Sequence, residues 1–537
     1  MRCTADWVLF LGVPLLLSGL LSGSLVAAND PVSEMVVPDV PDTVITEAYR
    51  EAGVRNVLAA VNPQVFPGYF SVCADGQGFG FGNSYPSLDG HQMTDALLWL
   101  GQVEVAKQNW DYVKTFQRAD GRLPLAILPA QAGQQIGPAA SPGLVAANGG
   151  LYQHWVPGDP LAALASPTYI QNADVIFRHT SEREWLAAQM DSVNLAADFL
   201  ASITTLDGMV RGGGYYVERP TRLEADGVTQ CYAIDAFRRA AALNRVVERT
   251  ADAAKYDVLA SRVEQHFRGK FWANTHFAEY WHPEHGFITN HGLTDVDWAA
   301  IATGAADRQQ ITVLWPQLRN EAAFYYGGMP TAISTKPQAY EDWEFAHPDR
   351  HDLASMGRVW YLESWARSRQ GDAAGLVDTL QRVVREGQAN GYSWRERYHP
   401  SSTGKPNPAG PEKYCEYPAN FIRIVNQFLL GIDLRLDGSL VIAPTVPDAY
   451  WEQGFGHTVA ARGGRLRFDL QRNRIALTYT GPAPLAVGVR APQTTSDKDW
   501  SLASGTATPR WDDGLLWVNL SPATADHPHS VILTRRE

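Results

Sequence analysis

A series of helical hairpins is the feature that most limits how this 537-residue chain can fold. In each hairpin, apolar residues recur at spacings of three and four, a Gly, Asp or Asn breaks the pattern, and a second amphipathic segment begins. Such hairpins need a closed or stacked arrangement to bury every apolar face. The clearest hairpins occupy residues 95–116, 234–267, 296–318 and 357–384, and further helices occupy 182–203 and 417–432. The chain is therefore predicted to be mainly α from about residue 41 to 433, with roughly a dozen helices.

The connections between the hairpins are long and irregular. They are rich in Gly and Pro, and they carry most of the Trp, Tyr, His and acidic residues. An α-solenoid would also supply hairpins, but it would show a regular repeat and short loops. Long loops that carry polar and aromatic residues are expected where several loops converge on one functional site.

The pattern changes after Gly431. Short alternating segments such as 439–444, 465–470 and 474–480 are separated by Asp-Gly, Gly-Gly and Pro turns. This pattern is typical of antiparallel β-structure and predicts a small β-sandwich. The expected organisation is a signal peptide at 1–28, a helical catalytic domain at 29–433 and a C-terminal β-sandwich domain at 434–537.

The first residues have the pattern of a secretory signal peptide. Arg2 precedes a mostly apolar run from 7 to 21, and the small residues Val26 and Ala28 suit signal-peptidase cleavage near Ala28. The apolar run is short for a membrane-spanning helix. We expect an exported protein, periplasmic or extracellular, without membrane insertion after cleavage. The cysteines that remain, Cys73, Cys231 and Cys415, define neither a disulfide framework nor a zinc site, and they leave the pairing of any single disulfide open.

The composition excludes some partners. A formal net charge of −12 and a pI near 5.6 give no basic field for nucleic acid or anionic membranes. Aromatic residues make up 11% of the chain and suit either stacking on sugar rings or a large core, and we assign most of them to the core. The histidines at 276, 282, 285 and 291 lack the spacing of metal ligands, so no metal or other cofactor is predicted.

One acidic residue has an unusual setting. Glu396 lies between two arginines and among aromatic residues in the stretch GYSWRERYHP, directly before a loop rich in Pro, Gly and Ser. Its carboxylate is either an ordinary ion-paired surface group or a group held ionised against a flat polar ligand such as a sugar. Glu416 follows 20 residues later, so the intervening loop is long enough to fold over a ligand.

Other loops supply further candidates. Glu218 follows a Gly-rich, Tyr-rich turn, a setting that can keep a carboxyl group protonated for general-acid catalysis, although it can equally pair with Arg219 or Arg222. Asp89 can bind a ligand or cap a helix, and capping or core packing is the alternative for the remaining candidates too. The residues expected to contact substrate are Tyr85, Asp89, His91, Asp226, Asp297, Trp298, Asp342, Trp343, Trp394, Arg397 and Glu416.

The order of these features resembles the six-hairpin, (α/α)6-barrel glycoside hydrolases, particularly trehalases and α-L-rhamnosidases. Residues 396–399 (Glu-Arg-Tyr-His) and 415–417 (Cys-Glu-Tyr) resemble the trehalase Glu-Lys-Tyr-Asp motif, which holds the catalytic base, and the Gly-Glu-Tyr that follows it. Residues 394–398 are similar to the Trp-Glu-Arg-Trp of rhamnosidases with one residue inserted. The stretches at 85–98, 328–333 and 340–345 resemble further trehalase motifs, so that the resemblance covers about residues 65 to 432. The β-domain resembles that of rhamnosidases and disaccharide phosphorylases.

The resemblance implies an (α/α)6 barrel and an exported inverting glycosidase that needs no cofactor. It implies that Glu396 is the general base. Glu218 matches the general acid best, although the motif around it departs from the trehalase Ser-Gly-Trp-Asp, and Glu224 and Asp226 compete with it. The substrates implied are terminal α-L-rhamnosides or α-glucosides. A disaccharide phosphorylase and a non-catalytic glycan-binding protein of the same fold are the alternatives.

Overall fold

The computed structural model describes residues 35–63, 68–74, 88–124, 126–129, 140–145, 150–153, 163, 165–212, 224–345, 350 and 353–536. The predicted signal peptide and the candidates Tyr85 and Glu218 lie outside these residues. Within them, no helix combines the length and the apolar character needed to cross a membrane.

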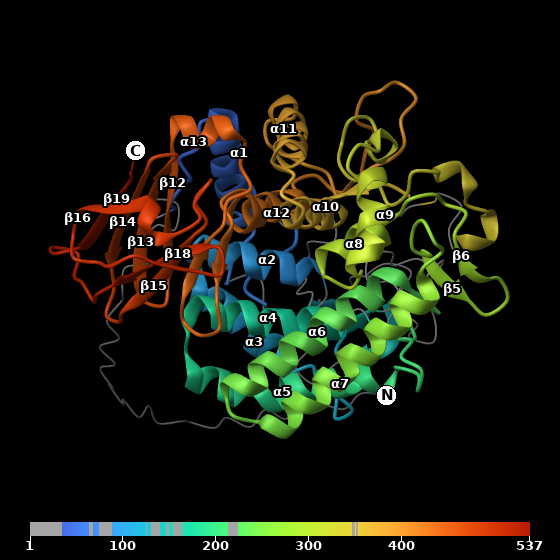
Figure 1. Ribbon diagram of the computed structural model, residues 1–537. Helices are drawn as coiled ribbons and strands as arrows, with labels where there is room; N and C mark the ends of the chain where they lie inside the picture. The colour runs from blue at the N-terminus through green and yellow to red at the C-terminus, as the bar shows by residue number, and fades with distance from the viewer. Residues whose placement is uncertain are drawn as a thin grey trace, which may run out of the picture.

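Twelve helices of the described chain form two concentric layers (Figure 1). Each inner helix packs on the next, and the last packs on the first, which closes a ring. The inner helices are α2 (Leu88–Trp99), α4 (Ala165–Thr180), α6 (Gly227–Val246), α8 (Asp295–Ala302), α10 (Gly357–Arg369) and α12 (Glu416–Ile424). The outer helices are α1 (Thr43–Ala52), α3 (Val103–Lys114), α5 (Arg183–Ser202), α7 (Thr250–His266), α9 (Arg308–Leu318) and α11 (Ala373–Ala389). The predicted (α/α)6 barrel is confirmed.

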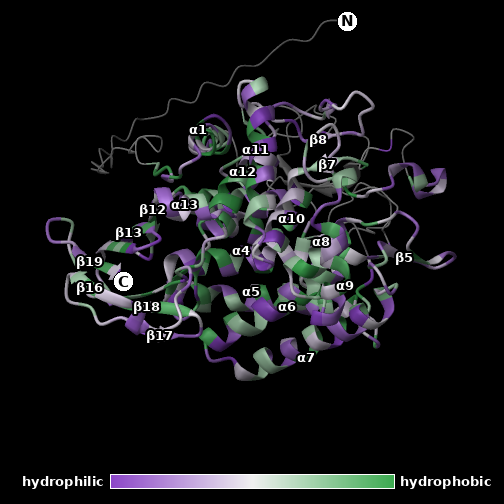
Figure 2. Cartoon of the chain, turned by 45° about the horizontal axis from the view of Figure 1, so that its top comes forward, coloured by the Kyte–Doolittle hydropathy of each residue, from purple (hydrophilic) through white to green (hydrophobic). Residues whose placement is uncertain are grey.

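The two layers bury their residues differently. Outer helices such as α7 and α11 carry both hydrophilic and hydrophobic residues along their lengths, as amphipathic helices do (Figure 2). Inner helices are buried on nearly every side, and polar side chains link them across the barrel interior. Gln171 of α4 donates to Asp235 of α6 at 2.8 Å. Arg423 of α12 donates to Asp95 of α2 at 2.7 Å, where the ring closes.

A β-sandwich follows the barrel, as predicted. The π-helical turn η8 (Val425–Leu429) leads into one sheet with the strand order β10-β11-β15-β18-β17, and the second sheet has the order β12-β13-β14-β19-β16. All neighbouring strands are antiparallel except β11 and β15, which are parallel. The strands are β10 (Ile432–Leu434), β11 (Leu440–Ile442), β12 (Phe455–Ala461), β13 (Gly464–Gln471), β14 (Arg474–Thr480), β15 (Leu485–Val489), β16 (Trp500–Ser504), β17 (Arg510–Asp512), β18 (Leu515–Leu520) and β19 (His529–Arg535), with helix α13 (Asp448–Gln453) between β11 and β12.

Three small sheets lie within the barrel loops. They comprise β1 (Ala126–Pro129), β2 (Ala140–Val145) and β3 (Gly150–Gln153); β4 (Ala225–Asp226), β5 (Tyr280–His282) and β6 (Gly286–Ile288); and β7 (Ser355–Met356), β8 (Arg397–Tyr398) and β9 (Pro408–Ala409). The cysteines Cys73, Cys231 and Cys415 are buried, and no disulfide joins them in this part of the chain.

Gly431 fixes the junction between the barrel and the sandwich. Its φ is +64°, and a Cβ atom there would lie 2.0 Å from the carbonyl oxygen of Ala443. Gly438 also has a positive φ, +89°, but a Cβ atom there would meet nothing within 4 Å. We therefore expect Gly431→Ala to lower the free energy of unfolding by about 3 kcal/mol or more, and Gly438→Ala by about 1 kcal/mol. Urea denaturation of both variants measures the difference, and equal losses would contradict this account of the junction.

Candidate active site

Three buried carboxyl groups gather where the inner helices begin. Asp89 is the second residue of α2, Glu416 is the first of α12, and Glu396 immediately precedes β8. Arg358, the second residue of α10, lies among them: its backbone N–H donates to Glu416, and its Nε is 3.3 Å from Glu416 Oε1. Tyr414 donates its hydroxyl to Asp89 Oδ2 at 3.1 Å. We call Asp89, Glu396 and Glu416 the carboxylate cluster.

Each member of the carboxylate cluster has one oxygen without a hydrogen-bond partner among the described residues. Asp89 Oδ1, Glu396 Oε2 and Glu416 Oε2 are buried and accept no hydrogen bond from the described residues. Most buried polar atoms in folded proteins are hydrogen-bonded, so three such acceptors at one place need an explanation. Donors on a ligand, such as the hydroxyl groups of a sugar, would satisfy all three.

Burial changes the acid–base properties of the cluster. It raises the pKa of Glu416 to about 8. The positive charge of Arg358 lowers this pKa, and the negative charge of Asp89 raises it. Burial also raises the pKa of Asp89 to about 6. Here too the charge of Arg358 lowers the pKa, and the neighbouring Glu396 raises it. Near neutral pH Glu416 therefore retains its proton while the neighbouring Asp89 is mostly ionised, and raised pKa values of this kind are common at acid–base catalytic sites.

Glu396 is held from two sides. Arg397 Nη1 donates to Glu396 Oε1 at 3.1 Å and brings a positive charge to the carboxylate. Gly410 packs on its other side with a φ of +80°, and a Cβ atom there would lie 2.4 Å from Glu396 Oε2. The other flanking arginine, Arg395, turns away and pairs with Glu412 at 2.6 Å. Glu396 is therefore ion-paired but buried, so it is not an ordinary surface group. Its contact with a ligand stays a prediction.

Four predicted contact residues have structural roles instead. Trp394 is fully buried and donates its Nε1–H to the carbonyl of Val383 at 3.0 Å. Trp298 is buried in the core beside Phe324. Because neither ring is accessible, both tryptophans pack in the core and do not stack on a sugar. The remaining two are helix caps: Asp226 accepts from the backbone of α6, and Asp297 accepts the backbone N–H of Thr294 at the start of α8 and that of Phe277.

Three further candidates lie away from the carboxylate cluster. His91 follows Asp89 by two residues on α2, but it contacts Asn172 at 2.7 Å and Arg423 at 3.2 Å, and burial lowers its pKa to about 4. Asp342 is exposed, and Trp343 is 42% exposed and stacks on the ring of His285. Both therefore lie at the protein surface.

The competing acids near Glu218 are also placed. Glu224 is exposed and pairs with Arg211 at 3.0 Å, whereas Asp226 is the buried helix cap described above. Neither has the setting expected of a general acid in a pocket. Glu218 itself lies outside the described residues, so its assignment stays a prediction.

A second buried network, which the sequence did not reveal, lies beside the start of α6. His291 contacts Glu279 and lies 3.3 Å from Glu344, and Tyr340 donates to Glu279 at 2.8 Å. Although burial disfavours a charged imidazole, its interactions with Glu279 and Glu344 raise the pKa of His291 to about 9. Glu279 also accepts the backbone N–H of Gly227 through its carbonyl, which fixes this network to the same end of the barrel. His291 is therefore a charged structural residue.

Arg358 and Tyr414 are the functional residues that sequence reasoning missed. Arg358 follows a glycine at an ordinary helix start, and no local motif marks it. Tyr414 does immediately precede the Cys-Glu-Tyr stretch, so its position next to a recognised motif is the one signal that was available.

Comparison with known proteins supports the fold. No family model and no curated protein matches the sequence. Solved structures do match. A GH78 family rhamnosidase of Bacillus sp. GL1 matches with a TM-score of 0.60 and 13% identity, over 86% of this chain and 43% of that one. An α-L-rhamnosidase from Dictyoglumus thermophilum matches with a TM-score of 0.55 and 10% identity, over 93% of this chain and 50% of that one. A putative kojibiose phosphorylase from the human microbiome also matches, with a TM-score of 0.52 and 11% identity, over 86% of this chain and 59% of that one.

The chain thus spans between 43% and 59% of the length of these three structures. At such low identities the likeness shows the fold alone. The expected resemblance to the six-hairpin glycosidases is confirmed at that level: this chain has an (α/α)6 barrel followed by a β-sandwich.

The raised pKa of Glu416 predicts a pH-dependent contribution to stability. Its carboxyl binds a proton more tightly in the folded protein, with a pKa of about 8, than in the unfolded chain. Between about pH 5 and pH 8 the folded state binds more protons, so this group lowers the free energy of unfolding as the pH rises. Glu416→Gln removes this pH dependence. We therefore expect the free energy of unfolding of the variant, relative to that of the wild type, to rise by about 1 to 3 kcal/mol from pH 5 to pH 8.

Urea denaturation at pH 5, 6.5 and 8 measures this gain. Glu412→Gln changes a half-exposed carboxyl in the same loop and should follow the pH dependence of the wild type. A constant difference between Glu416→Gln and the wild type at all three pH values would contradict the account.

Proposed function

We propose that this protein is a glycoside hydrolase that releases terminal sugars with inversion at the anomeric carbon. The observation that carries the proposal is the carboxylate cluster, with three buried carboxyl groups whose outer oxygens have no described partner. Its position at one end of an (α/α)6 barrel agrees with the glycosidase fold. Inverting hydrolysis requires a general acid and a general base on opposite sides of the glycosidic bond, and the cluster supplies the candidate base, Glu396.

In the proposed mechanism, Glu396 is the general base. Its Oε2 accepts a proton from a water molecule as that water attacks the anomeric carbon. The bond from the anomeric carbon to the glycosidic oxygen breaks, and the general acid donates its proton to that oxygen. We assign the general acid to Glu218. Asp89 and Glu416 accept hydrogen bonds from sugar hydroxyls and hold the ring in place.

The charges favour water over phosphate as the nucleophile. The carboxylate of Glu396 would repel a phosphate ion at the position of the attacking water, and the cation beside it, Arg397, is already paired with it. The unpartnered oxygens of Asp89 and Glu416 favour a neutral sugar with many hydroxyl groups over a uronic acid. We therefore propose α-L-rhamnosides or α-glucosides as substrates, and hydrolysis in preference to phosphorolysis.

The location follows from the sequence. We propose that the mature protein is exported, periplasmic or extracellular, after removal of residues 1–28. Its partner in that compartment would be a carbohydrate.

The first test concerns the base. Glu396→Gln keeps the size of the side chain but cannot accept the proton of water, so we expect turnover to fall by about 1,000-fold or more. Sugar release from aryl α-L-rhamnosides, aryl α-glucosides and trehalose, without phosphate, measures turnover, and Glu412→Gln serves as the matched control. Activity unchanged in Glu396→Gln would remove Glu396 from catalysis. No activity in the wild type together with intact sugar binding would indicate a glycan-binding protein, and activity only with phosphate would indicate a phosphorylase.

The second test concerns the acid. A leaving group of low pKa departs without protonation, so loss of the general acid harms substrates with poor leaving groups most. We expect Glu218→Gln to lose about 100-fold or more on an alkyl glycoside and far less on a dinitrophenyl glycoside. Glu224→Gln should behave like the wild type on both. Equal losses of turnover on the two substrates in Glu218→Gln would contradict the assignment of Glu218 as the general acid.

A further inference from the structure

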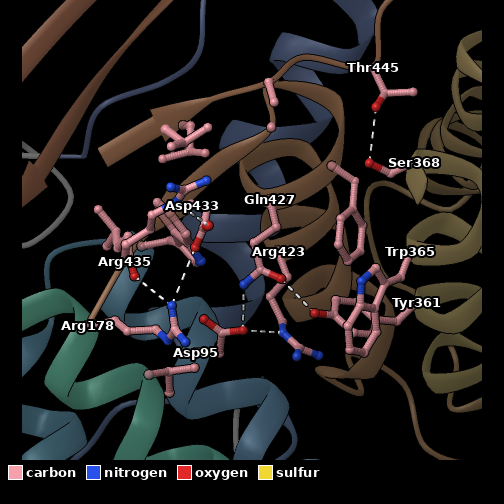
Figure 3. Close-up of a pocket in the computed structure, with 18 of the residues that line it drawn as sticks. Asp95, Arg178, Tyr361, Trp365, Ser368, Arg423, Gln427, Asp433, Arg435 and Thr445 are labelled. Carbon is pink, nitrogen blue, oxygen red and sulfur yellow. Dashed lines mark hydrogen bonds and ion pairs between the residues drawn. The ribbon is translucent and has the colours of Figure 1, made fainter. Parts of the chain in front are cut away.

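A cavity extends from the barrel interior to the β-sandwich. It has a volume of about 550 Å³. Its walls come from α2, which contributes His91, Asp95 and Trp99, from the later turns of α4 and α10, from Arg239 of α6 and Arg423 of α12, and from the turn η8 and strands β10 and β11 of the sandwich (Figure 3). None of Asp89, Glu396 and Glu416 lines the cavity, although His91, two residues after Asp89 on α2, does. The cavity therefore has a lining of its own, distinct from the carboxylate cluster.

The cavity is a junction between the two domains. Arg178 of the barrel donates to the carbonyl of Leu434 at 2.9 Å and pairs with Asp433 at 3.4 Å. Ser368 and Thr445 share a hydrogen bond of 3.0 Å across the same junction. Small-molecule sites are common at domain interfaces, and this volume suits a ligand of the size of a modified sugar.

The charge of the cavity is positive although the whole chain carries a net charge of −12. Four carboxylates pair with its arginines: Asp95 with Arg423, Asp174 and Asp235 with Arg239, and Asp433 with Arg178. The arginines that line it number six: Arg178, Arg239, Arg369, Arg423, Arg435 and Arg490.

Two of these arginines have no carboxylate partner in the described part of the chain. Arg369 donates through Nη1 to the carbonyl of Ala302 at 3.0 Å, and Arg490 is exposed at the cavity wall. Desolvation and the neighbouring charge of Arg238 lower the pKa of Arg369, and the charge of Asp235 offsets only part of this effect. A guanidinium group matches the planar or tetrahedral oxygens of a carboxylate or phosphate.

Aromatic rings complete the cavity. Trp365 and Phe428 lie parallel with centroids 6.2 Å apart, and Arg423 stacks 3.7 Å over the ring of Tyr361. Trp99 lines the wall beside His179. Such rings suit the apolar face of a ring-shaped ligand.

We propose that this cavity binds a small anionic molecule, a phosphate or carboxylate group on a sugar-sized body, with Arg369 and Arg490 contacting the anion. The ligand contacts barrel and sandwich together, so its binding stabilises the junction between the domains. The active site and this cavity therefore have opposite preferences: neutral sugars at the carboxylate cluster, and anions at the arginines.

The test is a titration of the full chain with glucose 6-phosphate, glucuronate and glucose at low ionic strength, where charge interactions are screened least. We expect at least one of the anions to bind at least tenfold more tightly than glucose and to raise Tm. The stronger of the two identifies phosphate or carboxylate as the recognised group. Calorimetry measures the affinities, and thermal unfolding measures Tm.

The double variant Arg369→Gln/Arg490→Gln identifies the site. Because neither arginine has a described carboxylate partner, the substitution leaves no such carboxylate without its ion pair, and the fold should be retained. We expect the double variant to lose anion affinity at least tenfold, whereas Arg55→Gln, at an exposed arginine that does not line the cavity, should not. Equal binding of glucose, no binding of either anion, or full affinity in the double variant would overturn the proposal.

Discussion

The packing of α12 against α2 is the contact on which the rest of the structure depends, because it closes six inner helices into a ring. The buried pair of Arg423 and Asp95 joins these two helices. A closed ring of helices that start at the same end collects their N-termini there and their C-termini at the other. Since helix N-termini favour negative charge, the carboxylate cluster occupies the end that suits it.

The barrel interior is charged, and that charge has a cost. Burial penalises the ionised forms of Asp89 and Glu416, and the charge of Arg358 offsets only part of that penalty. The pKa values of Asp89 and Glu416 are therefore raised, to about 6 and about 8. The raised pKa values and the unsatisfied oxygens would have one explanation in common under the proposed function: a ligand whose hydroxyl groups donate to this site.

The sequence predicted much of the fold, because apolar periodicity and turn residues are local signals. Helix α4 escaped detection, since it is buried on nearly all sides and carries Gln171, Asn172 and Asp174 inside the barrel. Within the site, Glu396 was recognisable from its motif, whereas Arg358 has no motif and acts only through its place in three dimensions. The prediction that Trp298 and Trp394 contact substrate was wrong. In the sequence, an aromatic residue near a loop that stacks on a ligand cannot be told from one that packs in the core.

The central claim is that water, activated by Glu396, attacks from the face opposite the leaving group. Proton NMR of the sugar released from a substrate of defined anomeric configuration, recorded within the first minutes before mutarotation, tests this most directly. The account predicts that the first sugar to appear, in the absence of phosphate, has the inverted configuration. A first product of retained configuration would contradict it, because retention requires a covalent intermediate and a nucleophilic carboxylate in place of a base.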